Sequence, residues 1–507
     1  MSTQSQSAVA DPSPISVEQF EMVAKTFQGL EDILAEELRN LGAHNVEPGR
    51  RMVSFTGDKE TLYRANLSCR TALRILKPFY KFRARTPEAL YDRVKEYNWT
   101  QLLSVDGTFA IETTVNSDEF THSRFVTYKV KDAIVDFFRD RSADGKRPGV
   151  RLQDADVVIN VHISGCDVTL SLDSSGESLH RRGYRVAQTE APINEVLAAG
   201  IILKSGWRGD CPFVDPMCGS GTFLIEAALI AANINPGIYR KGFAFEHWKD
   251  FDAELFDRLY NDDSHEREVT NTIFGADISP KAVDIARENI KRAGVAKYIN
   301  LQVKPLSQWT EAPKGGVLVT NPPYGERISV DDMDGLYAMI GEKLKHVFTG
   351  YHAWIIGYRD EYFARIGLAP SLKLPLYNGA LECELREYII FEGDMKGFRR
   401  NGGVLKTRDN AMPEKRQPRR ENSHRIQHNN GRDEKPASKS LRFGRNANPS
   451  ETSTAAQTTQ KSENPLAARR NEDALKSIIN RQPKLPVTAT VMRNRKGWKR
   501  NDDQNNK

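Results

Sequence analysis

The sequence predicts an α/β protein whose largest part is a doubly wound, mostly parallel β-sheet. Three observations lead to this prediction. Between positions 213 and 391, short apolar strands alternate with longer helical segments, and three of the strands end in glycine-rich or polar loops. Two shorter strand–helix units precede this region, and apolar residues become sparse after about position 397. We therefore expect two small α+β units, a large sheet and a basic tail without regular structure.

The composition fits a chain with a sizeable core. The 507 residues are 39% hydrophobic and 28% charged, which suits two or three domains. No apolar run is long enough to span a bilayer, and the polar first 15 residues do not resemble a secretory signal. The five cysteines show no C-x-x-C spacing, which argues against a zinc site or a disulfide framework. We expect a cytoplasmic protein without a metal or a membrane segment.

Charge is distributed unevenly along the chain. From position 401 there are 24 Lys and Arg against 11 Asp and Glu, whereas the first 400 residues hold 49 against 56. A basic arm on a mildly acidic body is common in proteins that bind polyanions, because Lys and Arg displace counterions from phosphates. A solubilising tail is the alternative. Residues 1–18 and 397–507 are expected to be disordered.

The two units before the large sheet cover residues 19–84 and 85–180. In the first, strands are expected at 20–24 and 52–55 and from 74, with helices at 33–41 and 62–67. In the second, helices are expected at 87–98 and 125–138 and strands at 108–115, 156–163 and 166–172. Since the second unit contains no clustered acid–base set, we expect a binding module.

The large sheet is expected within residues 186–396, after a basic cluster at 180–185. Its strands are predicted at 213–215, 272–277, 300–303, 316–320, 353–357 and 387–391. Its helices are predicted at 222–233, 281–293 and 335–347, with a further helix that Asn194 caps and that ends near Ile202.

The first candidate site motif is the loop that follows strand 213–215. Gly219 and Gly221 lack side chains, so a ligand can approach the backbone closely. The loop has neither G-K-[ST] nor G-x-G-x-x-G, and Asp215 would repel a phosphate. An acid here attracts a cation such as the α-amino group of S-adenosylmethionine. An ordinary strand-to-helix turn is the alternative.

The second motif places Asp277 and Ile278 at the end of the next strand. An acid at this position suits hydrogen bonds to two ribose hydroxyls. Asp277 by itself is equally suited to capping the helix that begins after Pro280. Its position one strand after the glycine loop favours the ribose role.

The third and most specific motif is Asn321-Pro322-Pro323-Tyr324, again at a strand end. The prolines restrict the backbone and hold their carbonyl groups in set directions. A ring amine is a poor nucleophile because its lone pair is delocalised. The Asn321 side-chain oxygen and the Pro322 carbonyl are suited to accept its two N–H bonds, and Tyr324 offers a face for an extruded base. A rigid proline turn is the alternative.

Together these motifs resemble the class I methyltransferases that methylate nitrogen. Other segments carry a closer resemblance, namely GLE at 29–31, YRANL at 63–67, LHRRGYR at 179–185, APINE at 191–195, NPG at 235–237 and FAFE at 243–246. Over roughly residues 20–395 the chain is similar to the bacterial 23S rRNA guanine-N2 methyltransferase family, which carries a THUMP domain. The resemblance implies a ferredoxin-like unit at 19–84, a THUMP RNA-binding domain at 85–180 and a Rossmann-like class I methyltransferase domain at 186–396.

The resemblance also implies roles for individual residues. The cofactor S-adenosylmethionine would be held by Glu195, Asp215, Pro216, Gly219, Gly221, Thr222, Asp277 and Ile278. The target base would be held by Asn321, Pro322, Pro323 and Tyr324. The basic residues expected to contact RNA are Lys129, Lys131, Arg181, Arg182 and Arg185. The expected partner is RNA, above all rRNA or a ribosomal assembly intermediate.

One departure and several alternatives accompany this interpretation. Many class I enzymes place an acid near the adenine amino group, but residues 301–308 contain none, which leaves Ser307, Gln308 or a backbone carbonyl for that contact. The Asn-Pro-Pro-Tyr motif also serves adenine-N6 and glutamine methyltransferases, although the RNA-binding module argues against a protein substrate. A tRNA guanine-N2 methyltransferase and a non-catalytic ribosome assembly factor are the remaining alternatives.

Overall fold

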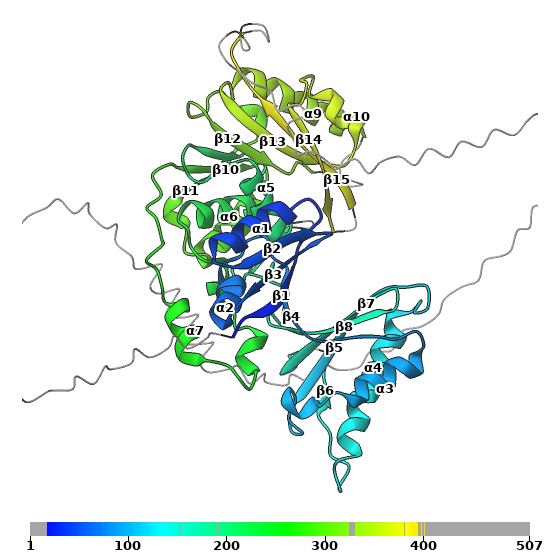
Figure 1. Cartoon of the computed structure of the whole chain (residues 1–507). Helices are drawn as coiled ribbons and strands as arrows, with labels where there is room; N and C mark the ends of the chain where they lie inside the picture. The colour runs from blue at the N-terminus through cyan, green and yellow to red at the C-terminus, as the bar shows by residue number, and fades with distance from the viewer. Residues whose placement is uncertain are drawn as a thin grey trace, which may run out of the picture.

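The computed structural model describes residues 18–152, 154–189, 192–323, 330–379 and 381–393, with the single positions 397 and 400. Within these residues the chain forms an eight-stranded and a seven-stranded sheet (Figure 1). Residues 1–17 and almost all of the basic tail lie outside the described residues. None of the described helices is long and apolar enough to cross a bilayer.

The eight-stranded sheet joins the two N-terminal units, in the order β2-β3-β1-β4-β8-β7-β5-β6. Its strands are β1 Phe20–Lys25, β2 His44–Gly49, β3 Met52–Gly57, β4 Arg74–Arg83, β5 Thr108–Asn116, β6 Gly149–Val150, β7 Val157–Ser164 and β8 Asp167–Asp173. The long strand β4 pairs with β1 through its first residues and with β8 along most of its length. The sequence predicted two separate units, but they share one continuous sheet.

Four helices belong to this region, and two of them begin at a capping side chain. The four are α1 Glu31–Asn40, α2 Lys59–Ser68, α3 Pro87–Glu96 and α4 Ser123–Arg139, with a short 3₁₀ turn η1 at Trp99–Gln101. The side chains of Asp58 and Thr86 accept hydrogen bonds from backbone N–H groups in the first turns of α2 and α3. α3 and α4 pack against each other and enclose a separate apolar core around Trp99.

The seven-stranded sheet has the order β11-β10-β9-β12-β13-β15-β14. Its strands are β9 Phe213–Asp215, β10 Ile273–Asp277, β11 Ile299–Val303, β12 Gly316–Thr320, β13 Tyr351–Gly357, β14 Leu372–Asn378 and β15 Leu381–Ile389. The first five in spatial order are parallel, whereas β15 runs antiparallel to both β13 and β14. The predicted doubly wound, mostly parallel sheet is therefore confirmed.

Helices and short turns flank this sheet. They are α5 Glu195–Lys204, α6 Thr222–Ala231, α7 Ala253–Tyr260, α8 Pro280–Arg292, α9 Val330–His346 and α10 Asp360–Arg365, with 3₁₀ turns η2 Pro236–Tyr239, η3 Ala244–His247, η4 Ala296–Tyr298 and η5 Leu306–Gln308. α5 and α6 are buried on nearly every side and consist mostly of apolar residues, as expected for central helices.

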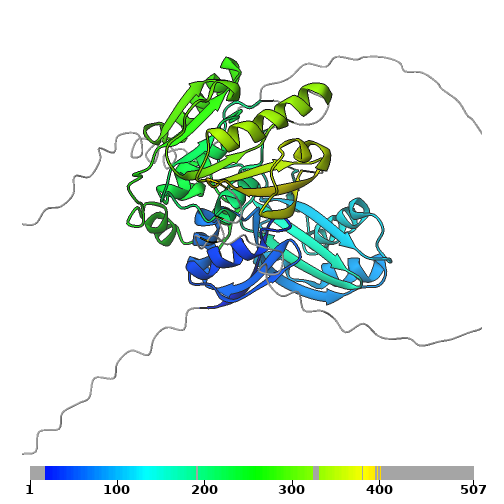
Figure 2. The same ribbon diagram turned by 90° about the horizontal axis from the view of Figure 1, so that it is seen from above.

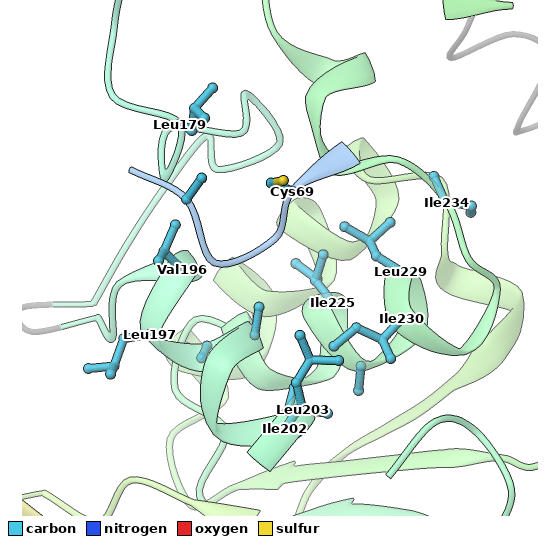
Figure 3. Packing of buried hydrophobic residues seen from close by; sticks show 14 of the residues in the cluster. Cys69, Leu179, Val196, Leu197, Ile202, Leu203, Ile225, Leu229, Ile230 and Ile234 are labelled. Carbon is cyan, nitrogen blue, oxygen red and sulfur yellow. The ribbon is translucent and has the colours of Figure 1, made fainter. Parts of the chain in front are cut away.

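The N-terminal unit packs directly on these central helices. In Figure 3, Cys69 from the segment after α2 lies beside apolar side chains of α5 and α6. α1 approaches α5 closely, because a Cβ atom at Gly200 would lie only 2.5 Å from Leu30 Cδ1. Only glycine permits this separation without displacing Leu30. One apolar core therefore extends from the first unit into the large sheet.

Two segments that carry the family resemblance meet at this junction. The Tyr63 ring of α2 stacks on Phe245 with 4.5 Å between centroids, and its hydroxyl accepts a hydrogen bond from the Asp252 N–H. Nearby, the Lys249 ammonium donates to the Thr100 and Leu103 carbonyls of the second unit. Figure 1 shows the first unit between the second unit and the large sheet, and in Figure 2 the first and second units lie side by side.

Sequence patterns missed the strands β2, β6 and β14 and the short helices α7 and α10. β2 is almost wholly exposed and contains Pro48, while β14 contains Pro375. Proline interrupts a strand pattern, but each of these strands lies at a sheet edge, where a missing N–H costs little.

Candidate active site

Three strand ends form the candidate site. β9 lies between β10 and β12, so Asp215, Asp277 and Asn321 follow neighbouring parallel strands at one edge of the sheet. The chain first adds β10 and β11 on one side of β9 and then adds β12 and β13 on its other side, so the strand order reverses at β9. Ligands of open α/β sheets bind in the crevice at such a reversal, beyond the carboxyl ends of the strands. The first and third motifs thus flank the crevice.

The glycine loop is folded back onto the end of β10. Gly219 and Gly221 have φ angles of 52° and 82°, in the left-handed region that favours glycine. A Cβ atom at Gly221 would also lie 3.1 Å from the Ala286 Cβ atom of α8. The Cys218 N–H donates to the Ala276 carbonyl and the Gly219 N–H to Asp277 Oδ2, both at 2.9 Å.

Asp215 is a buried acid at the centre of the site. Its Oδ1 atom accepts hydrogen bonds from the Thr320 hydroxyl at 2.9 Å and the Met217 N–H at 3.2 Å. Burial raises the pKa of Asp215 to about 7, against the lowering effect of these hydrogen bonds and with a smaller raising effect from the Asp277 charge. A cation bound beside Asp215 would favour its charged form.

Asp277 keeps room for a ligand. Its Oδ1 and Oδ2 atoms each accept one backbone N–H, from Ser279 and Gly219 respectively, at 2.9 Å. An ionised carboxylate offers about four lone-pair sites, so further donors can bind. Ser279, rather than Asp277, caps α8 by accepting from the Ala282 N–H. The neighbouring Ile278 side chain is 72% exposed and presents apolar surface at the same strand end.

Asn321 has an acceptor atom without a partner. Its Oδ1 atom is buried, yet it accepts no hydrogen bond from any described residue. Pro322 is buried and Pro323 is exposed. Tyr324 lies outside the described residues, so its predicted role stays a prediction. A buried unpaired acceptor is rare in native proteins and marks a place where a ligand donor fits.

Two of the five residues predicted to contact RNA have side chains that point into the protein, and their contact with RNA stays a prediction. The Arg182 side chain is 2% exposed, pairs with the buried Glu226, and donates to the carbonyls of Arg70 and Leu179. The Arg185 side chain is 15% exposed and pairs with Glu195 at 2.7 Å. The basic residues of this cluster indicated a polyanion site, but the guanidinium groups of Arg182 and Arg185 satisfy interior acceptors.

The other three predicted contacts lie at the surface. Arg181 is 64% exposed and forms an i,i+4 pair with Glu177. Lys129 and Lys131 on α4 are about one-third exposed and have the acids Glu88 and Asp132 as neighbours. Pairs of this kind are weak and exchange readily. These three side chains are available to a polyanion.

Two residues of the site escaped sequence reasoning. Thr320 immediately precedes the Asn-Pro-Pro-Tyr motif and hydrogen-bonds Asp215, which links the ends of β12 and β9. Asn289 lies on α8, and its side-chain amide donates to the Ser220 carbonyl of the glycine loop at 3.0 Å. The adjacent Asn-Pro-Pro-Tyr motif could have identified Thr320 as a site residue, whereas no sequence pattern marks Asn289.

A cavity of about 310 Å³ lies against β10 and β11, and its wall extends to Lys304, whose N–H donates to the Asp277 carbonyl at 3.0 Å. Its wall includes Phe274, Gln302, Lys304 and Trp309, but none of the predicted site residues. The candidate active site is therefore the crevice at the strand ends rather than this cavity.

Three protein-family models match the chain. The RlmL ferredoxin-like domain matches residues 21–76, the THUMP domain matches 84–173, and the RMKL-like methyltransferase domain matches 182–387. A putative RNA methyltransferase of Synechocystis sp. is 38% identical over 75% of this chain and 100% of that protein. The chain belongs to the THUMP-containing family of RMKL-like methyltransferases. The predicted family and fold are thus confirmed.

Other members of the family extend the likeness. The ribosomal RNA large subunit methyltransferase K/L of Syntrophotalea carbinolica is 42% identical over 72% of this chain, and the chain spans about half (53%) of that relative's length. Among solved structures, a putative methyltransferase complexed with SAH is 33% identical over 74% of this chain and 99% of its own, with a TM-score of 0.66. A possible methylase from Clostridium difficile is 31% identical over 74% and 100%, with a TM-score of 0.67.

Proposed function

We propose that this methyltransferase transfers a methyl group from S-adenosylmethionine to the exocyclic N2 amine of a guanosine in RNA, with 23S rRNA as the favoured substrate. The observation that carries the proposal is the buried Asn321 Oδ1 atom, which has no hydrogen-bond partner among the described residues and follows the strand next to that of Asp215. The K/L relatives, named as methyltransferases of large-subunit ribosomal RNA, support the choice of rRNA.

The crevice has the groups that this cofactor requires. Asp215 would receive the cationic α-amino group, and Asp277 would receive the ribose hydroxyls. Glu195, 5% exposed at the start of α5, lies next to the glycine loop through a shared partner, Arg185. Ile278 offers apolar surface for the adenine ring. That a related structure holds SAH supports the same cofactor here.

The protein's task is mainly to position two reactants. The bound cofactor supplies a methyl group on a positively charged sulfur, which is already activated for transfer. Asn321 Oδ1 and the Pro322 carbonyl accept the two N–H bonds of the amine and orient its lone pair. The nitrogen would become cationic as it bonds to the methyl carbon and the carbon–sulfur bond breaks, with its electron pair left on sulfur. The same two acceptors would stabilise that charge until a proton passes to water. No strong general base is required.

The THUMP unit would dock the RNA through α4. The Lys131 ammonium lies over the exposed ring of Tyr128 and the Lys129 ammonium lies over the Tyr91 ring, at 5.6 Å from each ring centroid. Phe125 on the same helix is 51% exposed. Cations interleaved with exposed aromatic rings suit unpaired nucleotides, because bases stack on the rings while phosphates attract the cations. Arg181 is a further surface cation, close in sequence to the site.

A second candidate is methylation of the N6 amine of adenine. A structure from Listeria monocytogenes titled a predicted N6-adenine-specific DNA methylase is 30% identical over 74% of this chain and 97% of its own, with a TM-score of 0.66. The same two acceptors would serve either amine. The THUMP unit favours RNA as the substrate.

Nucleoside mass spectrometry of 16S rRNA, 23S rRNA and tRNA, from cells with and without the gene, tests the proposal. We expect loss of one N2-methylguanosine from 23S rRNA, restored by the wild-type gene but not by Asn321→Ala. Loss from tRNA would move the substrate, and loss of N6-methyladenosine would favour the second candidate. No change in any methylated nucleoside would contradict methylation of these RNAs.

A further inference from the structure

Arg185 connects three segments around the candidate cofactor site. Its Nε atom donates to Glu195 Oε1 at 2.7 Å, and its Nη1 atom donates to the Ser220 hydroxyl at 3.1 Å. Its Nη2 atom donates to the Thr222 hydroxyl at 2.9 Å and to the Ile193 carbonyl at 3.1 Å. One guanidinium group thus joins the glycine loop, the first turn of α6 and the start of α5.

A second residue fixes the same loop from the opposite element. The Asn289 side chain of α8 donates to the carbonyls of Ser220 and Ala187 at 3.0 and 2.9 Å and accepts from the Val186 N–H at 2.9 Å. The stretch Arg185–Ala187, which leads from the THUMP unit into the methyltransferase domain, is therefore tied to the glycine loop at both of its ends.

The loop needs this external support. Gly221 is the N-cap of α6 and supplies no side-chain cap, and glycine backbones have many accessible conformations. A planar guanidinium with several donors in a rigid fork is well suited to hold separate acceptors in one geometry. The Arg185–Glu195 pair is also largely buried, so its charges interact more strongly than a surface pair would.

We propose that Arg185 is a positioning residue that holds the Gly219–Thr222 loop and the Glu195 carboxylate where the methionine end of the cofactor binds. The inference rests on the proposed function only in that S-adenosylmethionine occupies this crevice. Arg185 acts on the cofactor through Glu195, Ser220 and Thr222, which its hydrogen bonds orient. It has no role as an RNA contact.

Binding of S-adenosylhomocysteine (SAH) to the full chain, measured by titration calorimetry, tests this role. We expect Arg185→Met to raise the dissociation constant at least about tenfold, comparable to the loss of a residue that orients a ligand shell. Arg185→Lys keeps a cation for Glu195 but loses the fork, so it should recover only part of the affinity. Arg181→Met is the matched control from the same basic cluster and should leave SAH affinity unchanged.

Measuring RNA affinity distinguishes two possible roles of Arg185, positioning of the cofactor site and direct contact with RNA. With a 23S rRNA fragment, Arg185→Met should bind as the wild type does, whereas Arg181→Met should bind more weakly. The reverse pattern, with normal SAH affinity and weakened RNA affinity for Arg185→Met, would overturn the inference. If the wild type itself bound no SAH, the proposed function would fail as well, so the two failures are distinguishable.

A purely structural role is tested by a milder variant. Ser220→Ala removes one acceptor of the Arg185 fork without leaving a buried charge. We expect an unchanged unfolding temperature without cofactor and an SAH affinity reduced by about threefold or more, because the loop loses one hydrogen bond from the Arg185 guanidinium. If Ser220→Ala and Arg185→Lys both bound SAH like the wild type, Arg185 would not position the cofactor site, whatever the stability of Arg185→Met.

Discussion

At the scale of single residues, the proposed chemistry depends on side chains at the strand ends. Asn321 and Asp215 are both buried polar groups, but they differ in how the fold satisfies them. Asp215 receives two hydrogen bonds, whereas the Asn321 Oδ1 atom receives none from the described residues. The unpaired atom has the most to gain from a substrate donor, because its desolvation is not yet compensated.

Replacing Asn321 by Ala should lower the turnover number by about 10²–10³-fold, the usual effect of losing one group that stabilises developing charge. RNA affinity should change little, because the acceptor acts mainly on the charge that develops during transfer. Asn321→Asp keeps an oxygen acceptor and should retain more activity than Asn321→Ala. Single-turnover methylation and RNA binding would be measured in parallel, and an equal loss of both would contradict this role.

Asp215 predicts a pH dependence of cofactor binding. With a pKa of about 7, the Asp215 carboxyl group is largely protonated below that pH when no cofactor is bound. Since pairing with the α-amino group requires the carboxylate, SAH affinity should rise with pH through about 7, approaching tenfold per unit on the acid side. The affinity should fall again at higher pH, where the α-amino group loses its proton and with it the charge that pairs with Asp215.

The stability of the empty protein should show the opposite trend. Because the folded pKa of Asp215 lies above the unfolded value of 3.8, its contribution to stability is fully present below that value and is lost as pH rises through about 7. Asp215→Asn removes both effects. Calorimetric titration and thermal unfolding of the two proteins from about pH 5.5 to 8.5 would check them. A wild-type affinity that is flat across this range would exclude Asp215 as the partner of the amino group.

At the scale of elements, α9 contains two glycines whose surroundings differ, so replacing each by alanine should have a different effect on stability. Gly335 is exposed, and a Cβ atom there would meet nothing within 4 Å. At Gly341, in the same helix, a Cβ atom would lie 1.9 Å from the Ile366 carbonyl oxygen at the end of α10. Backbone cannot yield as a side chain can, so α10 packs against α9 only because position 341 is glycine.

The two Gly→Ala substitutions in α9 should therefore have opposite signs. Gly335→Ala should stabilise the protein by about 0.5–1 kcal/mol, because alanine loses less backbone entropy in a helix. Gly341→Ala should destabilise it by about 1–3 kcal/mol or more, since α10 must shift to accommodate the methyl group. Urea unfolding of both variants would check the difference. Similar effects of the two substitutions would show that α9 and α10 are not packed this closely.

For the whole molecule, the basic tail and the folded part have different expected roles. Residues 401–507 carry the surplus of positive charge, while the first 400 residues are mildly acidic. The crevice that would hold the cofactor is built entirely before the tail begins. Tail and site should therefore be separable in binding experiments.

Removing residues 400–507 should make RNA binding less dependent on salt. The slope of log affinity against log salt should become less negative by about 0.7–0.9 for each phosphate contact that is lost. SAH affinity of the truncated chain should equal that of the full chain. An unchanged salt slope after the deletion would mean that the tail makes no phosphate contacts.

The sequence alone determined the kind of sheet and the identity of its strand-end motifs. These features depend only on residues that are close together in the sequence, so they can be recognised without the structure. They include alternating strands and helices, capping residues such as Asn194, and polar residues directly after apolar strands. The order of those features along the chain was sufficient to predict that Asp215, Asp277 and Asn321 share one edge.

Only the tertiary structure decided which charged residues face solvent and which support the site. Arg181, Arg182 and Arg185 are nearly equivalent in sequence, yet Arg181 is exposed while the other two are covered by α5, α6 and the first unit. The shared eight-stranded sheet and the proline-containing edge strands were likewise invisible in the sequence. Burial and strand pairing depend on segments distant in the chain, which a local pattern does not contain.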